Sequence, residues 1–333
     1  MAELRRRATA LDVARAAGVS KTTVSYVLND TPGQQIPEQT RKRVHDAVRE
    51  LDYAPSSAAR ALRRGRNDTV LLILPDWPLQ HVVATILDEL TMEFDRHDLV
   101  LLTRRRRAGL SLAAMSREIM PAAVIALGAI DPADRATIQE SGTYVASALL
   151  TGTPSSGQIV VLPQDHIGEF QIQHLVSRGH TRIGYAAVSD PRQEPFLELR
   201  LLGARRAAAA LGSDPPDVIA VDLQPPPHGM TAAVTRWREL SITAVAAYND
   251  VVAAELLATM RGRGLAAPRD LAVIGVDDEP LSRFLVPPLT TIRQNEQVIA
   301  SHLANVVVEG IAGRPAPHLS STDAIEIVDR ASA

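Results

Sequence analysis

A polar helix face near the start of the chain could make hydrogen bonds to nucleic acid. In segment 9–29, TALDVARAAGVSKTTVSYVLN, the apolar residues Val24, Val27 and Leu28 recur at the spacing of one helix face. The outward face then offers an ammonium group, hydroxyl groups and a phenol, from Lys21, Thr22, Ser25 and Tyr26. Such groups can contact base edges and phosphates when a helix lies in the major groove of DNA.

Two short helices joined by a tight turn would position this face. Thr9 can cap the first helix, and Asp12 lies in its first turn, where the helix dipole favours negative charge. Gly18 falls where the chain must turn, and Ser20 can cap a second helix that begins at Lys21. The pattern predicts a helix-turn-helix, although an ordinary solvated helical hairpin would carry the same local signals.

A third helix and a short connecting segment follow. The helix is expected to begin near Pro37, a residue favoured at helix starts, and its apolar stripe includes Val44 and Leu51. Segment 56–66, SSAARALRRGR, allows a short helix that is marginal in isolation, because helix nucleation is costly. The segment is therefore interpreted either as a helix that forms on binding or as a flexible linker.

Charge separates this first part of the chain from the rest. Residues 1–66 hold 13 Lys and Arg against 7 Asp and Glu, a net +6, whereas residues 67–333 hold 22 against 31, a net −9. A basic helical segment ahead of an acidic body is typical of a DNA-binding head on a soluble core. A basic tail for anionic partners is the alternative.

Composition disfavours several other classes of protein. The 333 residues include no cysteine, which excludes disulfides and a thiol nucleophile. No apolar run approaches the length of a membrane span, and no secretory signal is recognisable at the N-terminus. The histidines show no close ligand spacing. We therefore expect a cytoplasmic protein with no membrane partner, no bound metal and no cofactor.

From Thr69 onward, short apolar runs alternate with helical patterns, which predicts parallel sheets in α/β layers. Ligands of such sheets bind beyond the carboxyl ends of the strands, so polar residues that end or follow the runs are candidates. They are Trp77, Asp165, Asn249 and Asp277. Carboxylates and an amide suit a ligand rich in hydroxyl groups, and Trp77 could stack on a sugar. Each polar residue alone could equally be a helix cap, and the low aromatic content of 3% keeps a nucleoside as an alternative ligand.

Several separate motifs resemble the lactose repressor (LacI/GalR) family. They are DVARAAGVSKTTVSYVLN, IPEQTRKRVHDAVRELDYAPSSAARAL, AYNDVVAAELL, DLAVIGVDDEP and PPLTTIRQN, in this order along nearly the whole chain. The resemblance implies an all-α helix-turn-helix head followed by an α/β core of two lobes with parallel sheets, similar to a periplasmic binding protein. It further implies that the effector binds between the lobes.

The resemblance also implies roles for particular residues. Leu62 aligns with a leucine that wedges into the minor groove when the hinge segment folds on the operator, and Ala59 with a neighbouring contact. Many members carry arginine at the position of Tyr26, so their base preference is not transferred here. The expected DNA-binding residues are Thr9, Ser20, Lys21, Thr22, Thr23, Ser25, Tyr26, Asn29, Ala59 and Leu62. The expected effector-binding residues are Trp77, Asp165, Arg200, Asn249, Asp277 and Gln294.

The expected domains are a head over residues 1–54, a hinge and linker over 55–68, and an effector-binding core over 69–333. Within the core, lobe 1 is expected at about 69–178 and 294–322, and lobe 2 at about 179–293 and 323–333. The chain would cross between the lobes near Arg178, Arg293 and Thr322.

These patterns predict a homodimeric transcriptional regulator, most simply a repressor that reads a pseudo-palindromic DNA operator under the control of a sugar-like effector. A solute-binding protein would share the core but does not explain the basic head. An enzyme is disfavoured because no nucleophile–base pair, phosphate-binding glycine loop or metal set accompanies the carboxylates.

Overall fold

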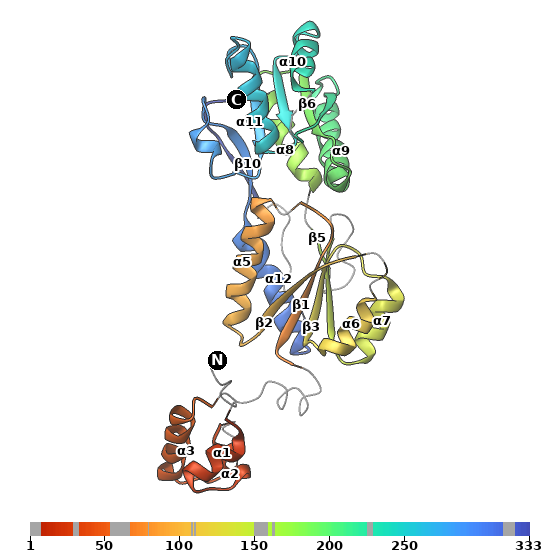
Figure 1. The fold of residues 1–333 in the computed structure, drawn as a ribbon. Helices are drawn as coiled ribbons and strands as arrows, with labels where there is room; N and C mark the ends of the chain where they lie inside the picture. The colour runs from red at the N-terminus through yellow and green to blue at the C-terminus, as the bar shows by residue number, and fades with distance from the viewer. Residues whose placement is uncertain are drawn as a thin grey trace. The chain divides into compact units, whose positions relative to one another are not determined.

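The computed structural model divides the chain into two compact units, residues 1–68 and 69–333 (Figure 1). It describes residues 8–28, 33–53, 67–78, 80–107, 109, 111–149, 159–161, 164–224, 229–315 and 324–333. The hinge residues Ala59 and Leu62, the predicted contact Asn29 and the predicted crossing at Thr322 lie outside the described residues.

The first unit contains three helices, α1 (Ala10–Ala17), α2 (Lys21–Leu28) and α3 (Glu38–Glu50). The Thr9 backbone N–H and hydroxyl both donate to the Asp12 carboxylate, at 2.9 and 2.6 Å, so the predicted cap forms as a capping box. Gly18 ends α1 with a φ of +63°, and the Thr23 N–H donates to the Ser20 hydroxyl at 3.0 Å to start α2. The helix-turn-helix is therefore stabilised locally at both helix starts and at the turn.

A small apolar core holds the three helices together. It consists of Val13, Ala14, Ala17, Val24, Val27, Val44 and Ala47. Because these side chains come from all three helices, the core fixes the orientation of α2 and leaves its other face toward solvent.

The second unit begins with a parallel sheet of strand order β2-β1-β3-β4-β5. Its strands are β1 (Thr69–Leu74), β2 (Val100–Arg105), β3 (Ala123–Leu127), β4 (Tyr144–Leu149) and β5 (Ile159–Val161). Helices α5 (His81–Asp95) and α12 (Glu296–Ile311) pack against one face, and α6 (Leu112–Ile119) and α7 (Pro132–Glu140) against the other. We call this sheet and its helices lobe 1.

Lobe 2 is built on a second sheet of order β11-β10-β9-β8-β6-β7. All its pairs are parallel except β10 with β11. Its strands are β6 (Ile183–Val188), β7 (Asp217–Val221), β8 (Ala244–Ala247), β9 (Ala272–Val276), β10 (Thr290–Gln294) and β11 (Ile325–Val328). Its helices are α8 (Gln164–Ser177), α9 (Glu194–Leu211), α10 (Met230–Glu239) and α11 (Asp250–Gly262), with short 3-10 turns at Pro191–Gln193 and Ser282–Phe284.

The chain enters lobe 2 earlier than the sequence indicates, and the expected boundary near Arg178 is wrong. Helix α8 belongs to lobe 2, because Ile167, Ile172 and Leu175 are buried in the same apolar cluster as β6, β8 and β9. The chain returns to lobe 1 between β10 and α12, at Asn295, close to the expected crossing at Arg293. Among the helices that the structure describes, none is long and apolar enough to cross a membrane.

Candidate functional site

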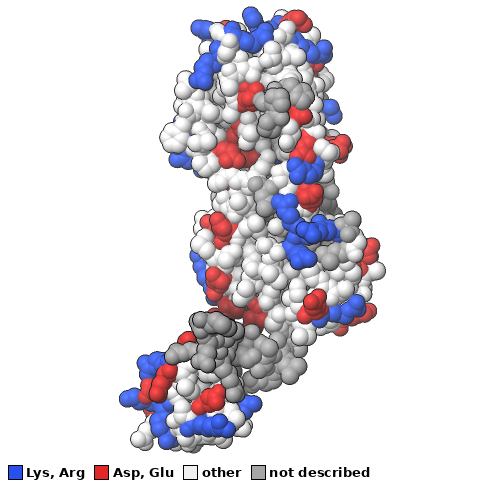
Figure 2. Space-filling model, viewed as in Figure 1, with Lys and Arg blue, Asp and Glu red and all other residues white. Residues whose placement is uncertain are grey.

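The exposed face of α2 presents the polar groups expected from the sequence. Lys21 and Thr22 are exposed, and Thr23, Ser25 and Tyr26 are partly exposed. Thr9 and Ser20 instead use their hydroxyl groups to start the two helices. Figure 2 shows Lys and Arg side chains at the surface of this unit, interspersed with Asp and Glu.

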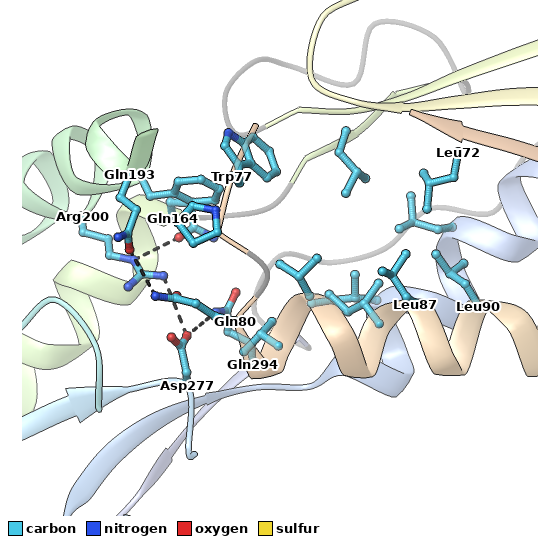
Figure 3. A pocket seen from close by; sticks show the side chains of 18 of the residues that line it. Leu72, Trp77, Gln80, Leu87, Leu90, Gln164, Gln193, Arg200, Asp277 and Gln294 are labelled. Carbon is cyan, nitrogen blue, oxygen red and sulfur yellow. Dashed lines mark hydrogen bonds and ion pairs between the residues drawn. The ribbon is translucent and has the colours of Figure 1, made fainter. Parts of the chain in front are cut away.

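A cavity in the second unit is lined by residues of both lobes. It contains about 830 Å³ of space free of protein atoms, open solvent included. Polar side chains gather at one end, around Arg200 and Asp277, and aliphatic side chains at the other, around Leu87 and Leu90 (Figure 3). A concave site with a few convergent polar groups among apolar ones is the usual form of a small-molecule site.

Arg200 is the centre of the polar end and is only 3% exposed. Its Nε donates to the Gln164 side chain at 3.0 Å and its Nη1 to the Tyr248 backbone carbonyl at 2.5 Å. Its Nη2 lies 3.9 Å from Asp277 Oδ1. The guanidinium also lies 4.7 Å from the centre of the Tyr248 ring, a cation–π geometry. A buried guanidinium held on several sides has a fixed direction, which suits it to orient a polar ligand.

The crossing of α8 and α9 places Arg200. A Cβ atom on Gly168 would lie 1.8 Å from the Arg200 carbonyl oxygen, and one on Gly203 would lie 1.8 Å from the Asp165 carbonyl oxygen. The two helix backbones can approach this closely only because both positions lack a side chain. Gln164 at the start of α8 consequently reaches Arg200 on α9.

Asp277 follows strand β9 in a strained backbone conformation, with a φ of +102°. Its Oδ1 accepts a hydrogen bond from Gln294 Nε2 at 2.8 Å. Burial raises the pKa of this carboxyl group, while Arg200 and the hydrogen bond from Gln294 oppose the rise. Strain at a buried acidic residue in a cavity is a common mark of a ligand site, because the surrounding structure must maintain it.

A second buried carboxylate supports the loop behind Asp277. Asp250 Oδ2 accepts hydrogen bonds from the Ser282 hydroxyl at 2.5 Å and the Glu279 N–H at 2.8 Å, and its Oδ1 accepts one from the Thr291 hydroxyl at 2.6 Å. Burial is the main cause that raises the pKa of Asp250 to about 7. Asp250 thus joins the start of α11 to β10 and to the loop after β9.

Two further contacts join the lobes at the cavity. The rings of Trp77 and Phe196 meet edge to face, with centroids 4.5 Å apart. Gln80 Nε2 donates to the Gln193 side chain at 3.3 Å. Since Trp77 and Gln80 lie in lobe 1 and the other two in lobe 2, ligand binding here would act on both lobes.

Four of the six predicted effector residues line this cavity, namely Trp77, Arg200, Asp277 and Gln294. The structure does not bring the other two to it. Asp165, in the first turn of α8, pairs with Arg206 at 3.1 Å on the outer side of α9. Asn249 caps α11 by accepting a hydrogen bond from the Val252 N–H at 3.0 Å. Both residues are therefore employed in local structure.

Sequence reasoning missed four polar lining residues, Gln80, Gln164, Gln193 and Tyr248. Gln164 is adjacent to the candidate Asp165, and Tyr248 is adjacent to the candidate Asn249. In both segments the residue that lines the cavity therefore lies one position before the predicted one. Gln193 lies beyond the end of β6, where the carboxyl-end rule applies equally. No group of His, Asp and Glu in the described ranges is arranged to hold a metal ion.

Comparison with known proteins connects both units to one family. The model of bacterial regulatory proteins of the lacI family matches residues 9–56, and a periplasmic binding protein-like domain matches residues 172–333. The HTH-type transcriptional regulator GalR of Escherichia coli K12 is 29% identical over 98% of this chain and 95% of its own length. The ribose operon repressor of the same organism is 28% identical over 91% of this chain and 93% of its own.

Solved structures agree with the fold over the same length. A lac repressor dimer bound to operator and the anti-inducer ONPF matches with a TM-score of 0.78 and 22% identity, covering 98% of this chain and 99% of its own. A complex of the regulator CelR with cellobiose matches with a TM-score of 0.65 and 24% identity, covering 98% and 100%.

A helix-turn-helix head joined to a two-lobed core of the periplasmic-binding-protein type defines a DNA-binding transcriptional regulator with an effector-binding domain, which is not an enzyme. Its head matches the lacI family of bacterial regulatory proteins over residues 9–56, and nearly the whole chain is similar to transcriptional regulators such as GalR.

Proposed function

We propose that this regulator is a repressor that binds a pseudo-palindromic operator as a homodimer. Its affinity for the operator would change when a small polar effector occupies the cavity. The observation that carries the effector part is the buried group of Arg200, Asp277 and Gln294 in a cavity lined by both lobes. A ligand held there would favour one arrangement of the lobes, and it can shift DNA affinity only by its differential affinity for the two states.

The chemistry of the polar end favours a polyhydroxylated ligand such as a sugar. Its guanidinium, carboxylate and amide groups can donate and accept hydrogen bonds in pairs, as vicinal hydroxyl groups do. Names of relatives agree with this class, since one is a ribose operon repressor and one structure is a complex with cellobiose.

The DNA-binding part of the proposal rests on α2. Its exposed polar face would enter the major groove, where Lys21 and Thr22 in its first turn could contact base edges and phosphates. The predicted hinge contacts of Ala59 and Leu62 would add a minor-groove wedge.

An exposed apolar patch supports the dimer. Leu281, Phe284 and Val286 are 73%, 73% and 72% exposed around one short turn of lobe 2. Clustered apolar side chains of this size commonly mark a protein interface. A second copy of this chain is the proposed partner, in keeping with the lac repressor dimer that shares the fold.

Selection from a genomic fragment library with purified protein, across a salt series, tests the proposal. One enriched pseudo-palindrome that is retained as salt increases would support it, because specific base contacts add to the salt-sensitive phosphate contacts. Retention of fragments without a shared sequence at every salt concentration would contradict it.

A further inference from the structure

The cavity has an aliphatic end that the polar groups do not explain. Helix α5 contributes Val83, Ile86, Leu87 and Leu90, which recur at the spacing of one helix face. They line the space together with Leu72 of β1 and Leu303 of α12. Figure 3 shows Leu72, Leu87 and Leu90 around it. We call this space the aliphatic slot; it is continuous with the polar end around Arg200.

The walls of the slot differ in how accessible they are, since Val83 and Leu87 are partly exposed. Leu72, Leu90 and Leu303 form its closed inner wall, since they are 0%, 0% and 1% exposed and pack in the apolar core of lobe 1. Partly exposed apolar side chains in a concave site gain dispersion contacts and lose water when a ligand covers them. Water gains little beside Val83 and Leu87 because it needs polar partners, so an apolar group displaces it readily. A hydrocarbon group is therefore the occupant that the slot favours.

The polar end, by contrast, favours a head group without net charge. The positive charge of Arg200 lies beside the negative charge of Asp277, 3.9 Å from Nη2 to Oδ1. The other polar side chains of this end are neutral: the amides of Gln80, Gln164, Gln193 and Gln294, and the phenol of Tyr248. A ligand carrying a full charge would have to break this balance in a buried site, whereas hydroxyl or amide groups can join the hydrogen bonds already formed.

We propose that the effector is an amphiphile, with a neutral head group rich in hydroxyls or amides at Arg200 and Asp277 and a hydrocarbon chain or ring in the aliphatic slot. The inference rests on the proposed function, which assigns the cavity to the effector. The Trp77–Phe196 ring pair, whose members both line the cavity, provides an apolar surface beside the head group.

A homologous series of 1,2-alkanediols with four, six, eight and ten carbons tests the proposal, since only the length of the chain varies. Binding to the full chain is measured by titration calorimetry and by the fluorescence of Trp77, with a Trp77→Phe variant to subtract the buried Trp237. Each methylene buried in the slot is expected to tighten binding about fourfold. Affinity that does not change with chain length, or no binding of the ten-carbon diol at its solubility limit, would overturn the proposal.

Variants on α5 show whether the dependence of affinity on chain length arises in the slot. Leu87→Gln places an amide in the slot and should remove most of the dependence on chain length, whereas Met92→Gln alters an exposed position of the same helix and should retain it. Val83→Phe, which fills the slot without adding polarity, should weaken the long diols more than the short ones. Equal behaviour of the Leu87 and Met92 variants would show that the diols bind elsewhere, and would overturn the assignment.

Operator binding separates the two proposals. A protein that selects one operator and responds to simple sugars, but shows no dependence on chain length, would refute the amphiphile and leave the regulator intact. A protein that binds long diols through the slot but selects no DNA sequence would refute the proposed regulator and leave the amphiphile site intact.

Discussion

At the scale of single residues, Arg200 carries the greatest weight, because it connects α8, α9 and the strand ends through its hydrogen bonds. Arg200→Ala should reduce the effector-dependent change in operator affinity at least about tenfold, since a charged hydrogen bond contributes about 1.5–3 kcal/mol. Fluorescence anisotropy of labelled operator, with and without effector, measures the change. Arg206→Ala, on the outer side of the same helix, should respond like the unmodified protein. An undiminished response of the Arg200 variant would place the effector elsewhere.

Asp250 predicts a pH dependence of stability. Its pKa rises from 3.8 to about 7 on folding, mainly through burial, so between these pH values the folded protein keeps a proton that the unfolded chain has released. The free energy of unfolding should therefore fall as pH rises through this window, by up to about 1.4 kcal/mol per pH unit for one proton.

Asp250→Asn should flatten this slope, because the amide does not titrate. Urea unfolding at pH 5 to 8, monitored by Trp237 in a Trp77→Phe background, measures it. Asp214→Asn, at an exposed position of the same lobe, should keep the original slope. Identical slopes for the two variants would show that Asp250 is ionised throughout.

At the scale of elements, the close crossing of α8 and α9 decides whether the polar end forms. Gly168→Ala would place a methyl group on the Arg200 carbonyl oxygen, separate the helices, and lower the free energy of unfolding by about 1–3 kcal/mol. Ligand affinity should fall with it. Gly262→Ala, where an added Cβ meets nothing within 4 Å, should leave stability unchanged or slightly raised. Chemical denaturation measures the free energy of unfolding of both variants. Equal values would show that the close crossing of α8 and α9 does not depend on Gly168.

The hinge segment 55–68 is expected to contribute the minor-groove contact of the operator complex. Leu62→Ala should weaken specific operator binding, on the order of tenfold, because the minor-groove wedge would be lost. Ligand binding by the isolated protein should not change. Equal loss of both activities would remove the wedge assignment.

At the scale of the whole molecule, the dimer depends on the apolar patch of lobe 2. Phe284→Asp should shift sedimentation toward the monomer and weaken operator binding, because an operator with two half-sites requires two heads. Leu202→Asp introduces the same charge at another exposed leucine, on α9, and should remain dimeric. A dimeric Phe284 variant would show that the copies meet at a different surface.

Much of this architecture could be predicted from the sequence, because the helix caps, the turn at Gly18 and the apolar runs are local signals. The direction in which a polar side chain points is not determined by the local sequence. Asp165 and Gln164 are adjacent at one helix start, yet only tertiary packing turns Gln164 to the cavity and Asp165 to Arg206. The aliphatic slot could not be predicted from the sequence either, since Leu87 and Leu90 have the spacing of any helix packed on a sheet.

If the cavity is coupled to DNA binding, the effector and the operator must change each other's affinity by the same factor. The affinity of the effector is measured with and without saturating operator duplex, and the affinity of the operator with and without saturating effector. We expect both affinity ratios to differ from one and to be equal, since the coupling free energy is shared. Effector affinity that is the same with operator, with a scrambled duplex and without DNA would contradict it.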